Sequence, residues 1–156
     1  MGKIHGVVTG QVVSMDDPDQ QGRVQVSLPF LGGQNQSAWA PVATLMAGGN
    51  RGSWFMPEVG DGVLIAFNQD DVAHPYIIGF MWNGQDAPPD PNYKNRVIVT
   101  PGGHTLRFED TAGSERIILK SSSGQTITLD DTGGGSITLA GGGRTFTMSN
   151  GTVQIS

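Results

Sequence analysis

Three copies of one eight-residue sequence motif determine the fold of the C-terminal part of this chain. His104-Thr-Leu-Arg-Phe-Glu-Asp-Thr111 is followed by Gln125-Thr-Ile-Thr-Leu-Asp-Asp-Thr132, and then by Arg144-Thr-Phe-Thr-Met-Ser-Asn-Gly151. The copies begin 21 and 19 residues apart. Apolar and polar residues alternate within each copy, and this period of two indicates a β-strand with one buried face.

Shorter strands of the same kind separate the copies, over 117–119 and 137–139. Glycine-rich corners follow the strands, at 102–103, 113, 124, 133–135, 141–143 and 151. The region from 97 to 156 therefore predicts a repetitive β-structure. Its expected inward-facing apolar residues are Leu106, Phe108, Ile117, Leu119, Ile127, Leu129, Ile137, Leu139, Phe146, Met148, Val153 and Ile155.

Such a tail cannot bury enough surface by itself. Each strand offers only two or three apolar side chains, and no segment with a helical period is present to cover them. A thin apolar stripe does not offset the entropy of ordering the chain, so repeats of this kind need neighbours. The pattern predicts oligomerisation, with each apolar stripe facing a shared axis. The alternative is a flexible Gly/Thr/Ser linker, which the strict alternation disfavours.

Composition places the chain in the all-β class. Among its 156 residues are 24 glycines and no cysteine, and only 15% are charged. Disulfides and thiolate metal sites are thereby excluded. No apolar run reaches membrane-spanning length, and no signal peptide is recognised at the N-terminus. We expect synthesis in the cytoplasm without a signal peptide.

Charge is distributed unevenly along the chain. Residues 1–92 hold 3 basic and 9 acidic side chains, a balance of −6, whereas residues 93–156 hold 6 basic and 5 acidic ones, a balance of +1. An acidic first part argues against a phosphate-backbone partner, so we expect no nucleic acid to bind.

The first part of the chain predicts five strands, over 4–15, 23–28, 39–46, 63–67 and 76–82. Five strands in about 80 residues suit a small Greek-key barrel of the OB type. The usual helix between the third and fourth strands is expected to be replaced by a loop around 48–52. We predict a barrel over 1–83, a proline-rich linker over 84–96 and a stalk over 97–156.

At this point the chain resembles a known family, the VgrG and phage baseplate central spike proteins. The resemblance is carried in the barrel by Gly22-Arg23-Val24-Gln25-Val26, by Trp39-Ala40-Pro41-Val42-Ala43, by the run from Gly52 to Phe67 and by His74-Pro75-Tyr76-Ile77-Ile78-Gly79. In the tail, Thr100 to Ile117 is similar to the start of the spike β-helix. The barrel positions that match the family motif include Trp54, Pro57, Gly60, Asp61, Pro75 and Gly79.

The resemblance implies a homotrimer. Three barrels would form a collar, and three tails would wind into an intertwined triple-stranded β-helix that carries the twelve apolar residues on its axis. Such a spike belongs to the baseplate of a phage tail or a tail-like injection particle, makes transient contact with a target membrane, and has no enzymatic activity, no cofactor and no metal. We expect the hub to be a separate protein, and a PAAR-like tip protein to sit on the C-terminal end.

Other candidate sites have weaker support. His5, His74 and His104 lack ligand partners at metal-binding spacing. Asp16, Asp17 and Asp19 lack the glycine and distal glutamate of an EF-hand and are expected to form a solvated turn.

The acidic pairs 109–110 and 130–131 would need a substrate cleft to act as a glycosidase site, so we interpret them as corner residues. Trp39, Trp54 and Trp82 suit core or trimer contacts better than base stacking. The alternative function is an OB-type module that binds an oligonucleotide or glycan and has a trimerising stalk; a cell-wall hydrolase spike is disfavoured because no such domain is present.

Overall fold

A computed structural model describes residues 5–31, 36–84, 86–149 and 151–155. The chain divides into two compact units, Met1–Ala87 and Pro88–Ser156. Regular structure in both is almost entirely β, with three short 3-10 turns, Pro29–Leu31, Asn68–Asp70 and Thr132–Gly134. The all-β prediction is confirmed.

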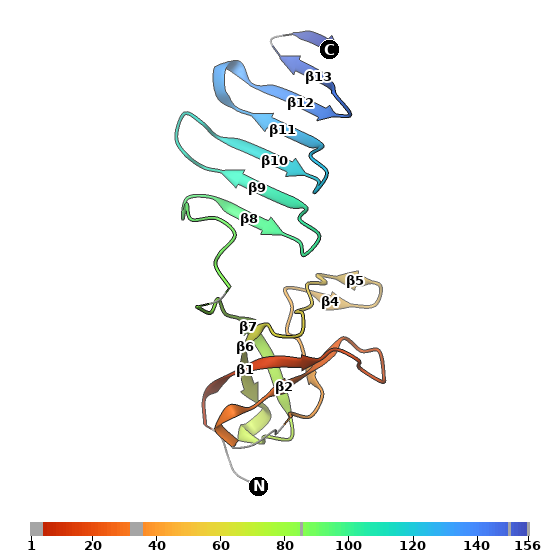
Figure 1. The fold of residues 1–156 in the computed structure, drawn as a ribbon, viewed down its shortest axis with the longest axis vertical. Coiled ribbons are helices and arrows are strands. Elements are labelled where there is room, and N and C mark those ends of the chain that lie inside the picture. The colour runs from red at the N-terminus through yellow and green to blue at the C-terminus, as the bar shows by residue number, and fades with distance from the viewer. Residues whose placement is uncertain (1–4, 32–35, 85, 150, 156) are drawn as a thin grey trace. The chain divides into compact units, whose positions relative to one another are not determined.

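The first unit is a nearly closed five-stranded barrel, as predicted. Its strands are β1 (Val7–Ser14), β2 (Arg23–Ser27), β3 (Ala40–Pro41), β6 (Gly62–Phe67) and β7 (Pro75–Phe80), in the order β3-β2-β1-β6-β7 (Figure 1). A bridge between Val42 and Ile77, with a hydrogen bond from the Ala43 N–H to the Ile77 carbonyl, brings the two ends of the sheet together.

Alternating residues of these strands build the barrel core. Val24 and Val26 of β2 face Val63 and Ile65 of β6, and all four are buried. The outward positions between them are only half-buried. The core is completed by Val12, Leu28, Ala40, Phe67 and Ile77.

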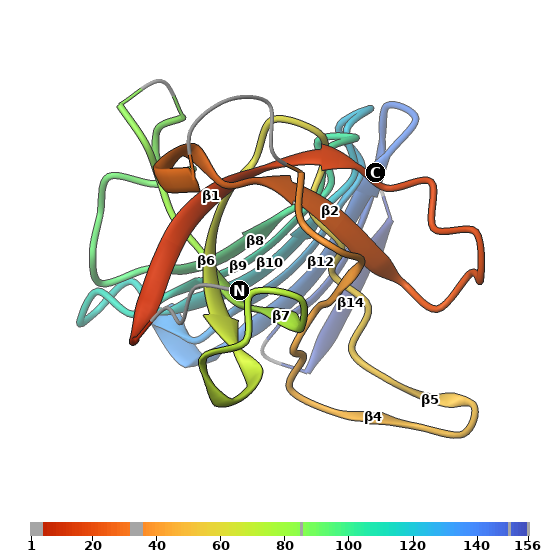
Figure 2. The ribbon, with the colours of Figure 1, turned by 90° about the horizontal axis from the view of Figure 1, so that it is seen from below.

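The third strand was predicted too long. Only Ala40 and Pro41 of the expected 39–46 segment pair with β2. Pro41 has no N–H to donate, and the chain leaves the barrel soon after it. The expected loop around 48–52 is instead a short hairpin, β4 (Ala47–Gly48) with β5 (Arg51–Gly52), which projects away from β1 and β6 (Figure 2). Ile4, the first residue of the predicted first strand, lies outside the described residues.

The second unit is a single seven-stranded antiparallel sheet in which each strand pairs with its neighbours in sequence (Figure 1). The strands are β8 (Arg96–Val99), β9 (Thr105–Glu109), β10 (Arg116–Lys120), β11 (Thr126–Asp130), β12 (Ser136–Gly141), β13 (Arg144–Ser149) and β14 (Thr152–Ile155).

Glycines stand at the corners of this sheet where the backbone needs a positive φ. Gly103, between β8 and β9, has φ +81°, and Gly124, between β10 and β11, has φ +95°. A side chain is strained in this region, so these corners use glycine to reverse the chain tightly. The described part of the second unit contains no helix long enough to cover either face of the sheet.

Candidate trimerisation surface

Two rows of apolar side chains run across one face of the tail sheet. Residues paired directly across antiparallel strands share a face, and the register aligns the apolar positions of every strand. The first row is Ile98, Leu106, Leu119, Ile127, Leu139, Phe146 and Ile155. The second row is Phe108, Ile117, Leu129, Ile137, Met148 and Val153. We call this surface the apolar face.

The apolar face is uncovered in a single chain. Leu129 and Ile137, in the middle of the sheet, are 39% and 40% exposed, and Ile155 at its end is 77% exposed. Completing the burial of a dozen half-exposed aliphatic and aromatic side chains would contribute on the order of 10 kcal/mol per chain. An exposed apolar surface this continuous indicates a protein partner.

The register brings together all twelve residues that the sequence predicted to face a shared axis. Whether they line the axis of a trimer stays a prediction, as does the intertwined β-helix, since each strand here pairs within its own chain. Sequence reasoning missed Ile98, which lies opposite Leu106. The run Val97-Ile98-Val99 is apolar throughout, so it has no alternation to identify the inward residue.

The opposite face of the same sheet is mainly polar over β11 to β13, although the aliphatic residues Val97, Val99 and Ile118 of β8 and β10 also lie on it. Thr128, Thr138 and Thr147 lie in one row across β11, β12 and β13. Threonine suits a solvated strand because its branched side chain fits the pleat and its hydroxyl stays hydrated. The sheet therefore has one face suited to water and one suited to burial.

Asp130 stabilises the turn that follows β11. Its carboxylate accepts hydrogen bonds from the N–H and hydroxyl of Thr132 and pairs with the Arg116 Nε at 2.8 Å. The Thr132 hydroxyl, its backbone N–H and then Arg116 hold the pKa of Asp130 below its usual range. The carboxylate is thus occupied by structural contacts, which agrees with its interpretation as a corner residue.

A second ionic cluster ties the predicted linker to the sheet. Asp90 is nearly buried, and its carboxylate accepts from the Asn95 Nδ2 at 3.0 Å and from the Asn92 N–H at 2.8 Å, and pairs with the Arg107 Nη2 at 3.0 Å. These contacts hold the pKa of Asp90 below its ordinary value, through Asn95 first. We call residues 90–95 the strap. No sequence pattern predicted the strap, because a lone Asp among prolines is typical of a linker.

The family-motif residues of the barrel have structural contacts. Pro57 and Pro75 are buried. The Asp61 carboxylate accepts from the Glu58 N–H at 2.8 Å, and the Gly60 N–H donates to the Val12 carbonyl at 2.9 Å. The 57–61 turn is thereby held against β1.

Two further motif positions lie at close approaches or irregularities. Trp54 is 73% exposed, yet its ring lies against Gly22, where an added Cβ would come within 2.6 Å of it. Gly79 lies opposite Leu64 at a β-bulge in the β6–β7 pair.

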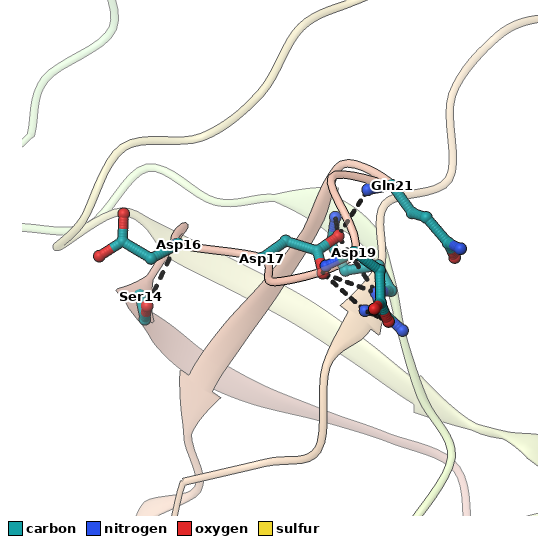
Figure 3. Close-up of polar contacts among 6 residues, drawn as sticks. Ser14, Asp16, Asp17, Asp19 and Gln21 are labelled. Atoms are coloured by element: carbon teal, nitrogen blue, oxygen red, sulfur yellow. Dashed lines mark hydrogen bonds and ion pairs between the residues drawn. The ribbon is translucent and has the colours of Figure 1, made fainter.

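The acidic loop between β1 and β2 is organised around Asp17. Its carboxylate accepts from the N–H groups of Asp19, Gln21 and Arg23, and it pairs with the Arg23 guanidinium at 2.6 Å (Figure 3). Hydrogen bonding from Arg23 is the main cause that lowers the pKa of Asp17, and Asp17 in turn raises that of Arg23. The Arg23 guanidinium thus pairs with the carboxylate oxygens that a bound cation would need as ligands.

Each of the three histidines has a different partner. His5 and His74 contact Asp70 and Asp71 at 2.9 and 3.0 Å, and the His104 Nδ1 accepts from the Ser122 N–H. Across the described ranges, no group of three or more His, Cys, Asp or Glu side chains could hold a metal ion. Within these same ranges, we find no helix whose length and apolar character would let it cross a membrane.

Comparison with known families agrees with this architecture. Residues 8–82 match the type VI secretion system/phage-baseplate injector OB domain. Residues 95–156 match the phage baseplate V C-terminal trimerisation domain. The apolar face thus lies within the region that matches the trimerisation domain.

Curated relatives include type VI secretion spike proteins. VgrG3 of Vibrio cholerae is 33% identical over 113 residues, which are 65% of this chain and 11% of that protein. VgrG5 of Pseudomonas aeruginosa is 33% identical over 126 residues, 72% of this chain and 16% of that protein. VgrG1b of the same species is 28% identical over 131 residues, 72% of this chain and 17% of that protein.

The chain spans between a tenth and a fifth of the length of these relatives. Another relative, from V. cholerae, is named actin cross-linking toxin VgrG1 and is 30% identical over 113 residues, which are 65% of this chain and 10% of that protein. With both of its units matched in order, the chain belongs to the VgrG and phage-baseplate spike family, and it consists of the injector OB domain followed by the trimerisation domain.

Proposed function

We propose that this chain is a non-enzymatic central spike of a contractile injection apparatus, working as a homotrimer that links a hub protein to a tip protein. The observation that carries the proposal is the uncovered apolar face of the tail sheet inside a trimerisation domain. Three copies of the sheet, each with its apolar face toward a common axis, would bury that face and present the threonine-rich face to solvent.

The polar outer face supports a mechanical role. Motion of the sheath would drive the spike through an envelope, and the spike itself needs stiffness rather than a reacting group. Seven strands spaced about 4.8 Å apart give each chain a stalk on the order of 30 Å long. The structural contacts of Asp17, Asp90 and Asp130 leave these carboxylates engaged in the fold.

Each end of the proposed spike would contact a different partner. The barrel end would meet the hub, as a separate protein of the same baseplate. At the other end, β14 is an edge strand whose Val153 and Ile155 are 57% and 77% exposed, and it would receive a PAAR-like tip protein. Contact with the target membrane would be transient, during contraction.

The competing function, an OB-type module for an oligonucleotide or glycan, has less support. The balance of −6 over residues 1–92 repels phosphate backbones. Only Arg23 and Arg51 stand near the strands that such modules use, and Arg23 is engaged by Asp17.

A complementation experiment tests the spike role. Particles from a producer that lacks the chain should fail to assemble a complete baseplate and to act on target cells, and the wild-type chain should restore both. A Leu129→Asp chain should restore neither, whereas Thr128→Asp, on the opposite face of the same strand, should restore both. Normal particles without the chain, or full rescue by Leu129→Asp, would contradict the proposal.

A further inference from the structure

The barrel exposes a group of large apolar side chains around its projecting hairpin. Leu45 is 95% exposed, Trp54 73% and Phe55 61%. Trp54 and Phe55 line a groove of about 520 Å³ between the hairpin and the β1–β2 loop, whose other apolar walls include Val42 and Met46. Leu45 is not part of its lining but directly precedes Met46 in the chain. We call this groove the arm groove. Apolar groups gathered at this density on a small acidic domain indicate a protein contact.

A second apolar surface lies across β1, β6 and β7. The register places Val7 opposite Ala66 and Ala66 opposite Tyr76, with all three side chains on the outward side of the barrel. Val7 is 54% exposed, Tyr76 40% and Ile78 44%. We call this strip the β7 face. It is made of residues distinct from those of the arm groove, and the hairpin projects away from β1 and β6 (Figure 2).

Two distinct surfaces on one barrel suit a threefold ring. Copies related by a threefold axis meet head-to-tail, so each copy offers one surface to the neighbour on one side and a different surface to the neighbour on the other. A twofold contact would instead need one surface that complements itself.

The short segment between the barrel and the stalk makes the barrel of a second copy the expected partner of these two surfaces. The barrel ends with the Met81 N–H bonded to the Gly62 carbonyl, and the stalk unit begins with the strap residue Asp90. The eight residues between Met81 and Asp90 allow these two residues to lie at most about 30 Å apart. Trimerisation of the stalks therefore holds three barrels within a small volume, at an effective concentration on the order of millimolar.

Charge placement agrees with this contact. Arg51 is the only charged residue of the hairpin region 45–56. Asp70 and Asp71 lie in the turn that leads into β7, where their only recorded ionic partners among the described residues are histidines. A basic arm meeting an acidic turn favours the head-to-tail arrangement over contact between like surfaces.

We propose that the arm groove of each barrel holds the β7 face of the next copy, so that three barrels close into a ring through head-to-tail contacts. The inference rests on the homotrimer of the proposed function and assigns the surfaces by which its barrels meet.

Engineered cysteines test the proposal cleanly, because the chain has no native cysteine. The variant that carries both Leu45→Cys and Ile78→Cys should give covalent dimers and trimers on a denaturing gel after treatment with a short bis-maleimide. After boiling in SDS, which separates chains that are not covalently linked, each single variant should run as a monomer, because in a head-to-tail ring identical positions are kept apart. The pair Leu45→Cys with Val59→Cys, at an exposed turn outside the β7 face, should cross-link at least tenfold less.

Two controls separate this inference from the proposed function. Adding Leu129→Asp to the double-cysteine variant should remove the covalent products together with the native trimer. A trimeric mass by light scattering without cross-linking would overturn the ring contact and leave the trimer standing. Efficient dimerisation of a single-cysteine variant would also overturn it, since that result requires like surfaces to meet. A monomeric wild-type chain would overturn both.

Discussion

At the level of single residues, hydrogen bonds and ion pairs of polar side chains stabilise the loops of the barrel. Asp17 shows this most clearly, because one carboxylate receives three backbone N–H groups and a guanidinium and so fixes the whole β1–β2 loop. The sequence indicated a turn there, but not which of the three aspartates organises it. That choice depends on where Arg23 enters β2, which spacing alone does not reveal.

Asp17 should make barrel stability depend on pH. Its pKa is lowered in the folded chain, chiefly by Arg23, while an unfolded Asp titrates near 3.9. Its stabilising contribution is therefore complete above about pH 4 and is lost progressively as the pH falls below that value. In thermal unfolding from pH 7 to pH 2, wild type should lose more stability than Asp17→Asn. Parallel curves for the two proteins would contradict this role.

Gly22 should be intolerant of a side chain. Its φ is +70°, and an added Cβ would come within 2.6 Å of the Trp54 ring. Gly22→Ala should lower the free energy of unfolding by about 1–3 kcal/mol, from the strained backbone together with displacement of the ring. Gly49→Ala is the matched control, because nothing lies within 4 Å of a Cβ there and its φ is not in the positive region. Equal stability of the two variants in urea would refute the prediction.

At the scale of elements, the tail was the more predictable part. Its period of two fixes which residues share a face, and glycine corners fix where strands end, so twelve of the apolar-face residues follow from local pattern. The barrel was harder to predict beyond its regular strands. Nothing local distinguishes Val42 to Met46 from a strand; the segment leaves the sheet because Pro41 cannot donate and because the hairpin pairs with itself.

Leu129→Asp should abolish assembly of the stalk. Leu129 lies in the centre of the second apolar row, and three copies would place three carboxylates together in an apolar environment. Analytical ultracentrifugation should show a single-chain species, whereas Thr128→Asp on the polar face should sediment as wild type. If Leu129→Asp assembled at the same concentration as wild type, the second apolar row could not lie at the trimer axis.

The strap should detach when its ionic partner is removed. Asp90→Ala leaves Asn92, Asn95 and Arg107 without their shared acceptor. Tryptic cleavage after the exposed Lys94 should then become several-fold faster, with Asp86→Ala, an exposed aspartate outside the strap, as the control. Unchanged cleavage would show that the cluster contributes nothing to holding the strap.

For the complete chain, one physical requirement favours assembly. A single-layer sheet with half-exposed apolar rows on one face is incomplete as a folded unit, and copies of itself offer matching rows at matching spacing. A trimer built this way should also be kinetically stable, because the stalk contacts of three chains must be lost together before any chain escapes.

The measurement that tests this most directly is the solution mass of the purified chain by light scattering, taken at micromolar concentration and neutral pH. The account predicts three times the 16.4 kDa chain mass, with a trimer band that persists after mild heating in SDS. A mass of one chain would contradict it, because the apolar face would then be stable in water without a partner.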